Sequence, residues 1–327
     1  MVILKNCSVV LWSFGCTIAL GYIALVSMKN INSHYQRRNE VQVRMTSPEK
    51  DSQTNYFNVM PKAARVHYNV SILPVNPVIR GIDTNMTDAQ AEDEFFYLTT
   101  HKQVNCKTRV RIGKKGDGGW DACNEEPYKL REPCLVYSIG INNDWSFDDA
   151  VVKQAGCEVH AFDPTMNITD HKRGKSIYFH NIGLGVEDTI NDLGWKMRRV
   201  STIMKDLGHD NKIIDFFKMD IEYSEWMVFP EMIRDGVLGK IKQLVFEFHT
   251  HMRKHTGNTV ASSHYKEPTK EQYITKWKTL EQLEKAGLRR FFHNTNWGGK
   301  YQSKYTRKIR SPYQEVYYLN VNYLNPH

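Results

Sequence analysis

Residues 134–164 read CLVYSIGINNDWSFDDAVVKQAGCEVHAFDP and predict a strand, a glycine turn, a helix and a second strand. The apolar run Leu135–Ile139 ends at Gly140, as expected where a buried parallel strand leads into a turn beneath a ligand. The apolar residues that follow are spaced to bury one helical face, and Gly156 stops that helix. A strand over 158–162 comes next, so the stretch predicts the first half of a nucleotide-type binding site.

The acid that ends the second strand is Asp163, about twenty residues beyond the turn, where doubly wound folds hold the ribose hydroxyls of a nucleotide. The turn, GINNDW over 140–145, has a single glycine and lacks the G-x-G-x-x-G that lets a backbone approach a pyrophosphate. Such a loop suits a ligand without phosphates, and S-adenosylmethionine is the common one. Asn142 or Asp144 would receive its amino acid end. The competing interpretation is that glycine and Asp-Pro are ordinary turn signals.

A second group of acids follows an apolar strand, in the sequence IIDFFKMDIEYSEW over 213–226. Ligands of open α/β sheets lie beyond the carboxyl ends of the strands. Asp220 and Glu222 lie on the same side of an extended backbone and are expected to face that crevice together. Glu225 comes one helical turn later and is expected to support them. The competing interpretation is a strand end followed by helix-capping acids.

These motifs in combination resemble one family of methyltransferase domains. They are GDGGWDAC over 116–123, CLVYSIGINNDWSFDDAV, GCEVHAFDP and FFKMDIEYSEW, and the family is the methyltransferase-like protein 24 type, which is related to FkbM-type methyltransferases. The resemblance covers roughly Tyr97 to Tyr323. It implies a class I, Rossmann-like fold that uses S-adenosylmethionine, with a mostly parallel sheet, helices on both faces and a C-terminal antiparallel hairpin.

The resemblance also assigns residues. Gly140 would be the first-motif glycine, Asp163 the ribose-binding acid, and Asp220 with Glu222 the D-x-E pair. The ordinary first motif carries an acid two residues before the glycine, and Ser138 stands there in this chain. The predicted cofactor-binding residues are therefore Ser138, Gly140, Asn142, Asp144, Asp163 and Asp220.

Further strands and the expected hairpin can be placed on the remaining sequence. Apolar runs over 176–180 and 241–248 alternate with helical patterns, which predicts a parallel α/β sheet. An amphipathic helix over 280–286 precedes a strand over 288–292. After a turn-rich segment, alternation over 314–323 predicts the last strand.

The segment after the strand at 241–248 carries candidate bases. His249 and Glu247 are each suited to accept a proton from a substrate hydroxyl, a role that needs a tunable group near the methyl acceptor. His249 and His251 are also spaced so that both could join Asp220 or Glu222 on a metal. No clear further ligand has metal-binding spacing, so we predict no metal. The predicted catalytic residues are Asp220, Glu222 and His249.

Length and composition predict one catalytic domain behind an anchoring region. The chain has 327 residues, of which 41% are hydrophobic and 24% charged. Residues 1–6 form a short tail, 7–28 an uncharged run long enough to cross a bilayer, 29–94 a polar flexible stem and 95–327 the methyltransferase domain. The apolar run is predicted to be a transmembrane signal-anchor or a cleaved signal peptide.

Two features favour export of the domain through the ER or Golgi. Asn69, Asn85 and Asn167 begin glycosylation triplets, and an even number of cysteines follows the apolar run. The excess of basic residues after the run argues the other way, because positive flanks stay in the cytoplasm. We expect a membrane-tethered protein with a luminal or extracellular domain, or a secreted one.

Cys106, Cys123, Cys134 and Cys157 allow two disulfides in three connectivities. One pairing is Cys106 with Cys123 and Cys134 with Cys157. The alternative is four buried thiols in a cytosolic domain.

The sequence thus predicts a methyltransferase that acts on an oxygen or nitrogen of an unknown acceptor, such as a glycan or small molecule. The net charge of +8 indicates a solvated basic face or affinity for acidic glycans or lipid headgroups, and nucleic acid is not an expected partner. One alternative is a catalytically inactive glycoprotein that keeps the fold as a binding module. Another is a nicotinamide-dependent oxidoreductase, which the absent G-x-G-x-x-G disfavours. The oligomeric state does not follow from the sequence.

Overall fold

A computed structural model describes residues 70–73, 81–251 and 266–324. The run at 7–28, which we predicted to cross or enter the membrane, and most of the predicted stem lie outside these residues. Within them, no helix combines the length and apolarity that a membrane crossing requires. The chain divides into one compact unit of residues 61–189 with 196–327 and another of 1–60 with 190–195. In the second unit the described part is a turn in which Asn191 Oδ1 accepts hydrogen bonds from the N–H groups of Leu193 and Trp195.

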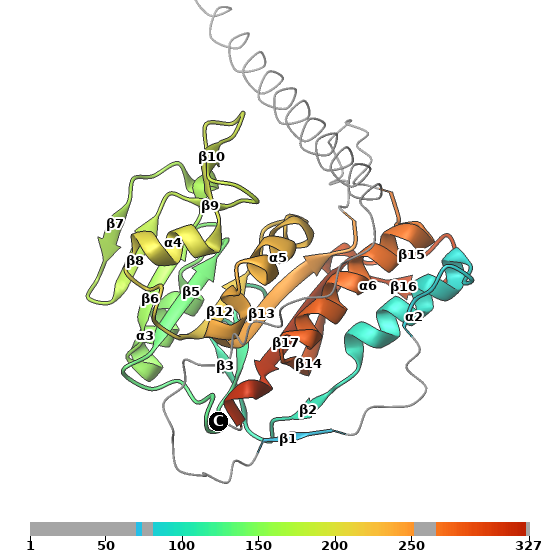
Figure 1. Ribbon diagram of the computed structural model, residues 1–327, viewed down its shortest axis with the longest axis horizontal. Helices are drawn as coiled ribbons and strands as arrows, with labels where there is room; N and C mark the ends of the chain where they lie inside the picture. The colour runs from blue at the N-terminus through green and yellow to red at the C-terminus, as the bar shows by residue number, and fades with distance from the viewer. Residues whose placement is uncertain (1–69, 74–80, 252–265, 325–327) are drawn as a thin grey trace, which may run out of the picture. The chain divides into compact units, whose positions relative to one another are not determined.

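The larger unit has an α/β fold built on an eight-stranded mixed sheet (Figure 1). The strand order is β14-β17-β13-β12-β5-β6-β8-β7. The strands are β5 (Leu135–Ile139), β6 (Glu158–Phe162), β7 (His171–Arg173), β8 (Ile177–His180), β12 (Ile214–Met219), β13 (Ile241–His249), β14 (Leu288–Asn296) and β17 (Tyr313–Asn320). The order β8-β6-β5-β12-β13 is the 3-2-1-4-5 arrangement of doubly wound folds, and these neighbours pair in parallel.

Antiparallel strands complete both edges of the sheet. β17 pairs antiparallel with β13 and with β14, and β7 pairs antiparallel with β8. The helix before β14 is longer than the predicted 280–286, because α6 (Lys270–Lys285) begins at a capping box formed by Thr269 and Gln272. β14 likewise extends to Asn296, into the segment expected to be a turn.

The two faces of the sheet carry different elements. On one face, Phe217 lies in the main core cluster. The apolar residues that pack with it there come from four helices, α2 (Asp88–Thr100), α4 (Val200–Asp206), α5 (Glu225–Arg234) and α6. The neighbouring Phe216 points to the opposite face, since side chains alternate along a strand, and its ring lies 5.5 Å from that of Phe147 on α3 (Ser146–Ala155). Gln243, on the same face as Phe216, accepts a hydrogen bond from the N–H of Cys123 on β4 (Trp120–Cys123).

The remaining elements are short. They are β1 (Ser71–Ile72), β2 (Val104–Asn105), β3 (Arg109–Ile112), β4 (Trp120–Cys123), β9 (Gly183–Leu184), β10 (Thr189–Ile190), β11 (Lys196–Arg198), β15 (Tyr301–Gln302), β16 (Ile309–Arg310) and the 3-10 turns Pro164–Met166, Val237–Lys240, Trp297–Gly299 and Val321–Leu324. β3 and β4 form an antiparallel pair that covers part of the face carrying Gln243.

Helix α2 spans the domain boundary that we predicted at residue 95. Its first turn is fixed by a capping box in which Thr87 and Gln90 exchange hydrogen bonds. Phe95 is fully buried, with its ring 5.7 Å from Phe248 and 5.1 Å from Tyr273. The packed fold therefore includes residues that we had assigned to the stem.

Two disulfides join the four described cysteines, Cys106 with Cys123 and Cys134 with Cys157. The predicted pairing is confirmed, and the alternative of four free thiols is wrong. Cys134–Cys157 ties the start of β5 to the start of β6, which holds in register the two strands on which the predicted cofactor site depends. Asn85 and Asn167, two of the predicted glycosylation acceptors, are exposed.

Candidate active site

The turn after β5 is pressed against the end of β12. Gly140 adopts a left-handed conformation with φ of +72°, and a Cβ built on it would lie 1.7 Å from the carbonyl oxygen of Asp220. Lys218 Nζ on β12 donates hydrogen bonds to the carbonyl oxygens of Ile139 (3.0 Å) and Gly140. Only glycine fits this close approach, so the glycine that the sequence singled out has a structural reason.

The turn also contacts the acid at the end of β6. Asn142 has φ of +43°, and its N–H donates to Asp163 Oδ2 at 2.7 Å. Asp163 Oδ1 accepts from the backbone N–H and the hydroxyl of Thr165, at 2.8 and 2.6 Å. Asp163 is thus buried beside the predicted turn, with both carboxylate oxygens already hydrogen-bonded by the chain itself.

The third predicted polar group of the turn, Asp144, has a partner that the sequence reasoning missed. Its Oδ2 lies 2.7 Å from Lys114 Nζ, and its Oδ1 accepts from the N–H of Ser146. Burial alone would raise the pKa of Asp144, but the hydrogen bonds from Lys114 and Ser146 lower it overall. Ser146 also donates to the carbonyl of Gly118 at 3.1 Å. The glycine-rich loop 113–119 therefore folds onto the start of α3, and GDGG in the family motif was the available signal.

A buried carboxyl lies on α3, near the position where Ser138 replaces the usual acid. Asp148 is fully enclosed, and burial raises its pKa to about 6 although the charge of Lys218 acts in the other direction. Ser138 is also buried, and its hydroxyl, like the charge of Lys218, acts to lower the pKa of Asp148. Asp148 was not predicted, because an acid on the apolar side of a helix gives no sign of its partner in the sequence.

The predicted catalytic residues converge at the carboxyl ends of β12 and β13. His249 is the centre of the group, with its side chain 2% exposed. Its Nε2 lies 3.3 Å from Glu222 Oε2 and 3.4 Å from Glu247 Oε2, while its Nδ1 lies 3.3 Å from Glu225 Oε1. Glu225 also accepts the N–H of Ile221, which lies between Asp220 and Glu222 in the chain, at 3.1 Å.

Burial and crowding of charge determine the protonation of this group. For His249, burial favours the neutral ring, but Glu225, Asp220 and Glu247 outweigh it and raise its pKa to about 10. Burial and the charge of Asp220 raise the pKa of Glu247 to about 8. Burial raises that of Asp220 to about 6. At neutral pH the histidine is therefore charged, and Glu247 is the group poised to exchange a proton.

Two further features mark this end of β12. Glu222 and Tyr223 are consecutive non-glycine residues with φ of +54° and +80°, a conformation that costs each roughly 1–3 kcal/mol and is concentrated at functional sites. Asp220 Oδ1 is buried and has no hydrogen-bond partner among the described residues. A buried, unsatisfied carboxylate oxygen is costly unless a ligand or proton compensates it.

Ligand atoms of Asp220, Glu247 and His249 all lie within 4.8 Å of one another, so these three could hold a metal ion. His251, the second histidine that the spacing offered to such a metal, has other contacts. His251 Nδ1 lies 3.1 Å from Thr250 Oγ1, and its ring packs 4.9 Å from that of Tyr301. Among the described residues this group contains one histidine, and the absence of a metal stays a prediction.

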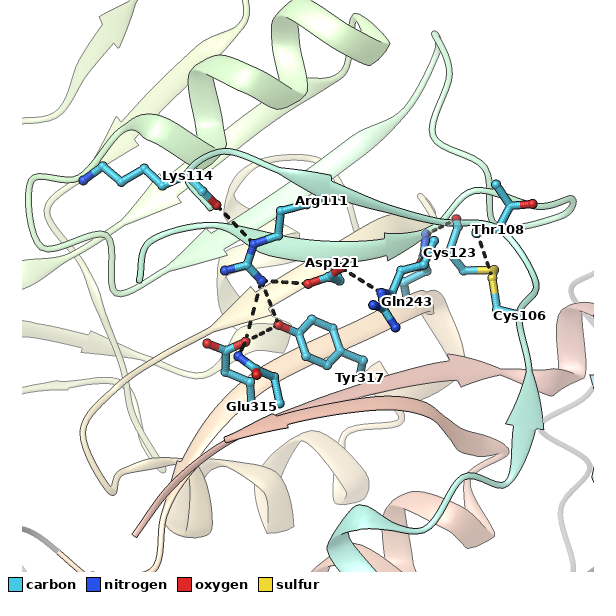
Figure 2. A network of polar contacts seen from close by, with 11 residues as sticks. Cys106, Thr108, Arg111, Lys114, Asp121, Cys123, Gln243, Glu315 and Tyr317 are labelled. Atoms are coloured by element: carbon cyan, nitrogen blue, oxygen red, sulfur yellow. Dashed lines mark hydrogen bonds and ion pairs between the residues drawn. A yellow bond between two sulfur atoms is a disulfide. The ribbon is translucent and has the colours of Figure 1, made fainter. Parts of the chain in front are cut away.

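A polar network joins the β3–β4 pair to Glu315 and Tyr317 on β17 (Figure 2). Arg111 Nη1 lies 2.7 Å from Asp121 Oδ2 and 3.8 Å from Glu315 Oε2, and Tyr317 donates to Glu315. Glu315 on β17 is the register partner of Glu247 on β13. Arg111 also donates to the carbonyls of Lys114 and Gly116, so the same side chain positions the glycine-rich loop.

Comparisons with known proteins agree with this geometry. Residues 50–287 match a protein family described as "Methyltransferase domain". "Probable methyltransferase-like protein 24" of Homo sapiens is 28% identical over 142 residues, which cover 40% of this chain and 38% of that protein. The protein of the same name in Rattus norvegicus is 28% identical over 179 residues, covering 50% of this chain and 48% of the relative. The chain thus spans less than half the length of the curated relatives it matches. With most of its length matched by the family, the chain belongs to the methyltransferase-domain family of the methyltransferase-like protein 24 type.

Proposed function

We propose that the protein is an S-adenosylmethionine-dependent methyltransferase acting on an oxygen or nitrogen of an acceptor. The observation that carries this is the meeting of the Gly140 turn with Asp220, whose buried Oδ1 lacks a partner beside a charged His249. This arrangement lies beyond the carboxyl ends of β5, β12 and β13, where doubly wound folds bind ligands. The residues that would hold the cofactor are Ser138, Gly140, Asn142, Asp144, Asp163 and Asp220. The bound cofactor supplies a methyl group on a sulfonium centre.

The chain's own contribution to the reaction is positioning and proton transfer. An acceptor hydroxyl or amine loses a proton when its oxygen or nitrogen gains a methyl group. With a pKa raised to about 8, Glu247 is matched to accept that proton near neutral pH. His249 is protonated there and cannot act as the base, so its role is to hold Glu222, Glu225 and Glu247 in place.

The compartment is part of the proposal. Two disulfides favour an oxidising environment, and therefore a luminal, extracellular or secreted domain. We propose that residues 7–28 tether the protein to the membrane or direct its secretion.

A catalytically inactive binding module is the second candidate, and one observation favours it. Asp163 and Asp144 are both satisfied by groups of this chain, Asp163 by Thr165 and Asn142 and Asp144 by Lys114. A cofactor would have to share or displace those hydrogen bonds, which lowers the net affinity to be gained from them.

Calorimetric titration of S-adenosylmethionine into the full-length protein distinguishes the two. We expect wild type to bind, and Asp163→Asn and Asp220→Asn to bind at least about 10-fold more weakly, equivalent to about 1.4 kcal/mol each. Asp206→Asn is the matched control, because Asp206 is an exposed acid at the end of α4. A folded wild-type protein that does not bind the cofactor would overturn the enzyme proposal and leave the binding module.

A further inference from the structure

Three side chains that the proposed reaction does not use meet at the other end of the sheet. Glu158 and His160 lie on β6, and His209 follows α4. The side chains of His160 and His209 are 7% and 4% exposed, whereas that of Glu158 is 43% exposed. Glu158 begins β6, so this group lies toward the amino ends of the strands, while the candidate active site lies beyond their carboxyl ends. The two groups are therefore separate sites.

The atoms of this group are spaced like ligands of one metal ion. Glu158 Oε1 lies 3.2 Å from His160 Nε2 and 3.6 Å from His209 Nε2, and the three residues each offer a ligand atom within 4.8 Å of the other two. A tetrahedral zinc ion with bonds of about 2.0–2.1 Å separates its ligand atoms by roughly 3.3–3.4 Å. Two histidines and one carboxylate are a known zinc ligand set that leaves the fourth position open.

The second nitrogen of each ring is held as metal-bound histidines require. His160 Nδ1 lies 2.9 Å from His180 Nε2, and His209 Nδ1 lies 2.9 Å from the hydroxyl of Tyr137. Such outer contacts fix the orientation and tautomer of a ligating imidazole. Both contacts leave Nε2 as the atom that faces Glu158.

The protons on the histidine rings can be arranged to suit a bound cation. Without metal, Nε2–H of His160 donates to Glu158, Nε2–H of His209 faces the same carboxylate at 3.6 Å, and the Nδ1 atoms accept from His180 and Tyr137. With metal, each proton moves to Nδ1 and is donated outward, because His180 Nε2 and the tyrosine oxygen can also accept. His180 then carries its own proton on Nδ1, which lies 3.8 Å from Asp170 Oδ2. No ring needs to gain or lose a net charge.

The segment that carries His209 is fixed in place. The N–H of His209 donates to the carbonyl of Met204 at 2.6 Å, and its own carbonyl accepts from Lys212 at 2.9 Å. The positive charge of Lys212 would repel a bound metal ion. Its side chain is exposed, so water screens this repulsion. A metal here would connect β6 to the segment after α4.

We infer that Glu158, His160 and His209 form a binding site for a zinc-class divalent metal, with the partly exposed side of Glu158 leaving room for a water as the fourth ligand. The bound ion joins two segments about fifty residues apart in the sequence, 158–160 and 209, and stabilises the folded state because an unfolded chain offers no preformed site.

The test uses full-length protein dialysed against a chelator and then given Zn²⁺, with bound metal measured by elemental analysis. Co²⁺ is the spectroscopic probe, because tetrahedral coordination by nitrogen and oxygen gives intense visible bands. We expect one tightly held metal that depends on this group, an increase in thermal midpoint with Zn²⁺, and visible Co²⁺ bands. Glu158→Gln and His209→Gln should each weaken binding about 100-fold, and Tyr137→Phe, which removes only the outer hydroxyl, about 10-fold.

His171→Gln is the matched control, because His171 is an exposed histidine on β7 that lies outside the group. It should bind Zn²⁺ as wild type does. Glu158→Gln decides the outcome if His209→Gln does not fold, since Glu158 is partly exposed and the variant keeps its size. Absence of Zn²⁺ binding by folded wild type, or equal binding by wild type and Glu158→Gln, would overturn the inference.

Discussion

Replacing Glu247 by glutamine should stabilise the protein at alkaline pH and have little effect at acid pH. The side chain of Glu247 is 9% exposed, and its Oε1 accepts a hydrogen bond from Asn296 at 3.1 Å, which a glutamine oxygen can also accept. Glutamine therefore resembles the protonated acid in size and hydrogen bonding. What it removes is the cost of ionising a carboxyl in this buried position.

The magnitude follows from the raised pKa of Glu247. In the unfolded chain the carboxyl titrates near its ordinary value of 4.5, and in the folded protein at about 8. Below pH 4.5 both states hold the proton and the group does not affect stability. As the pH rises from 4.5 to 8 the unfolded state ionises first, so the free energy of unfolding falls by about 1.4 kcal/mol per pH unit, or up to about 5 kcal/mol in total. Above pH 8 the loss is constant.

Guanidinium unfolding at pH 5, 7 and 9, with the disulfides intact, measures this effect. The free energy of unfolding of Glu247→Gln should exceed that of wild type by less than about 1 kcal/mol at pH 5 and by several kcal/mol at pH 9, with unchanged denaturant slopes. Glu187→Gln is the control, because Glu187 is exposed and should follow wild type at each pH. A difference between Glu247→Gln and wild type that does not grow with pH would refute the reasoning.

Two further predictions concern the turn and its crosslink. Gly140→Ala should destabilise the protein by at least about 3 kcal/mol. The left-handed φ is strained for alanine, and the added Cβ also clashes with the Asp220 carbonyl. Gly174→Ala has a similar φ of +67° and open space around it, so it should cost only about 1–2 kcal/mol. If the two substitutions lower the free energy of unfolding in urea equally, the turn at Gly140 and the Asp220 carbonyl can move apart at no cost, and the prediction is wrong. The double variant Cys134→Ser and Cys157→Ser opens a crosslink of 23-residue separation and should lose about 3 kcal/mol, measured by the same unfolding experiment. A loss below about 1 kcal/mol would mean that β5 and β6 need no crosslink to pair.

Local sequence patterns were sufficient for the elements around the candidate active site. β5 was predicted at Leu135–Ile139 and β6 at 158–162, and both have those bounds in the structure. The reason is that a buried strand flanked by glycine and Asp-Pro carries its signals within a few residues. Helix α6 was predicted too short. Its first turns carry many polar residues, and their low mean hydropathy obscures the apolar residues of the buried face.

The partners within the site depended on the tertiary structure. Asp220, Glu222 and Glu225 could be grouped from the sequence, since they lie within one turn after β12. That Glu247 and His249 complete the group follows from the parallel register of β12 and β13, in which Met219 pairs with Phe246. The sequence did not predict that Glu247 rather than His249 is poised to exchange a proton, because that depends on which carboxylates surround the ring.

The sequence left the pairing of the four cysteines open among three connectivities, and by itself it determined the α/β class of the fold, the glycine turn and the strand-end acids. These rest on short-range patterns of apolar and turn residues, which act along the chain. Only the tertiary structure decided which charges lie within a few ångströms of one another, as at His249 and at His160 with His209. Burial then strengthens each of those contacts by excluding water, and neither burial nor distance between remote segments is written in a local pattern.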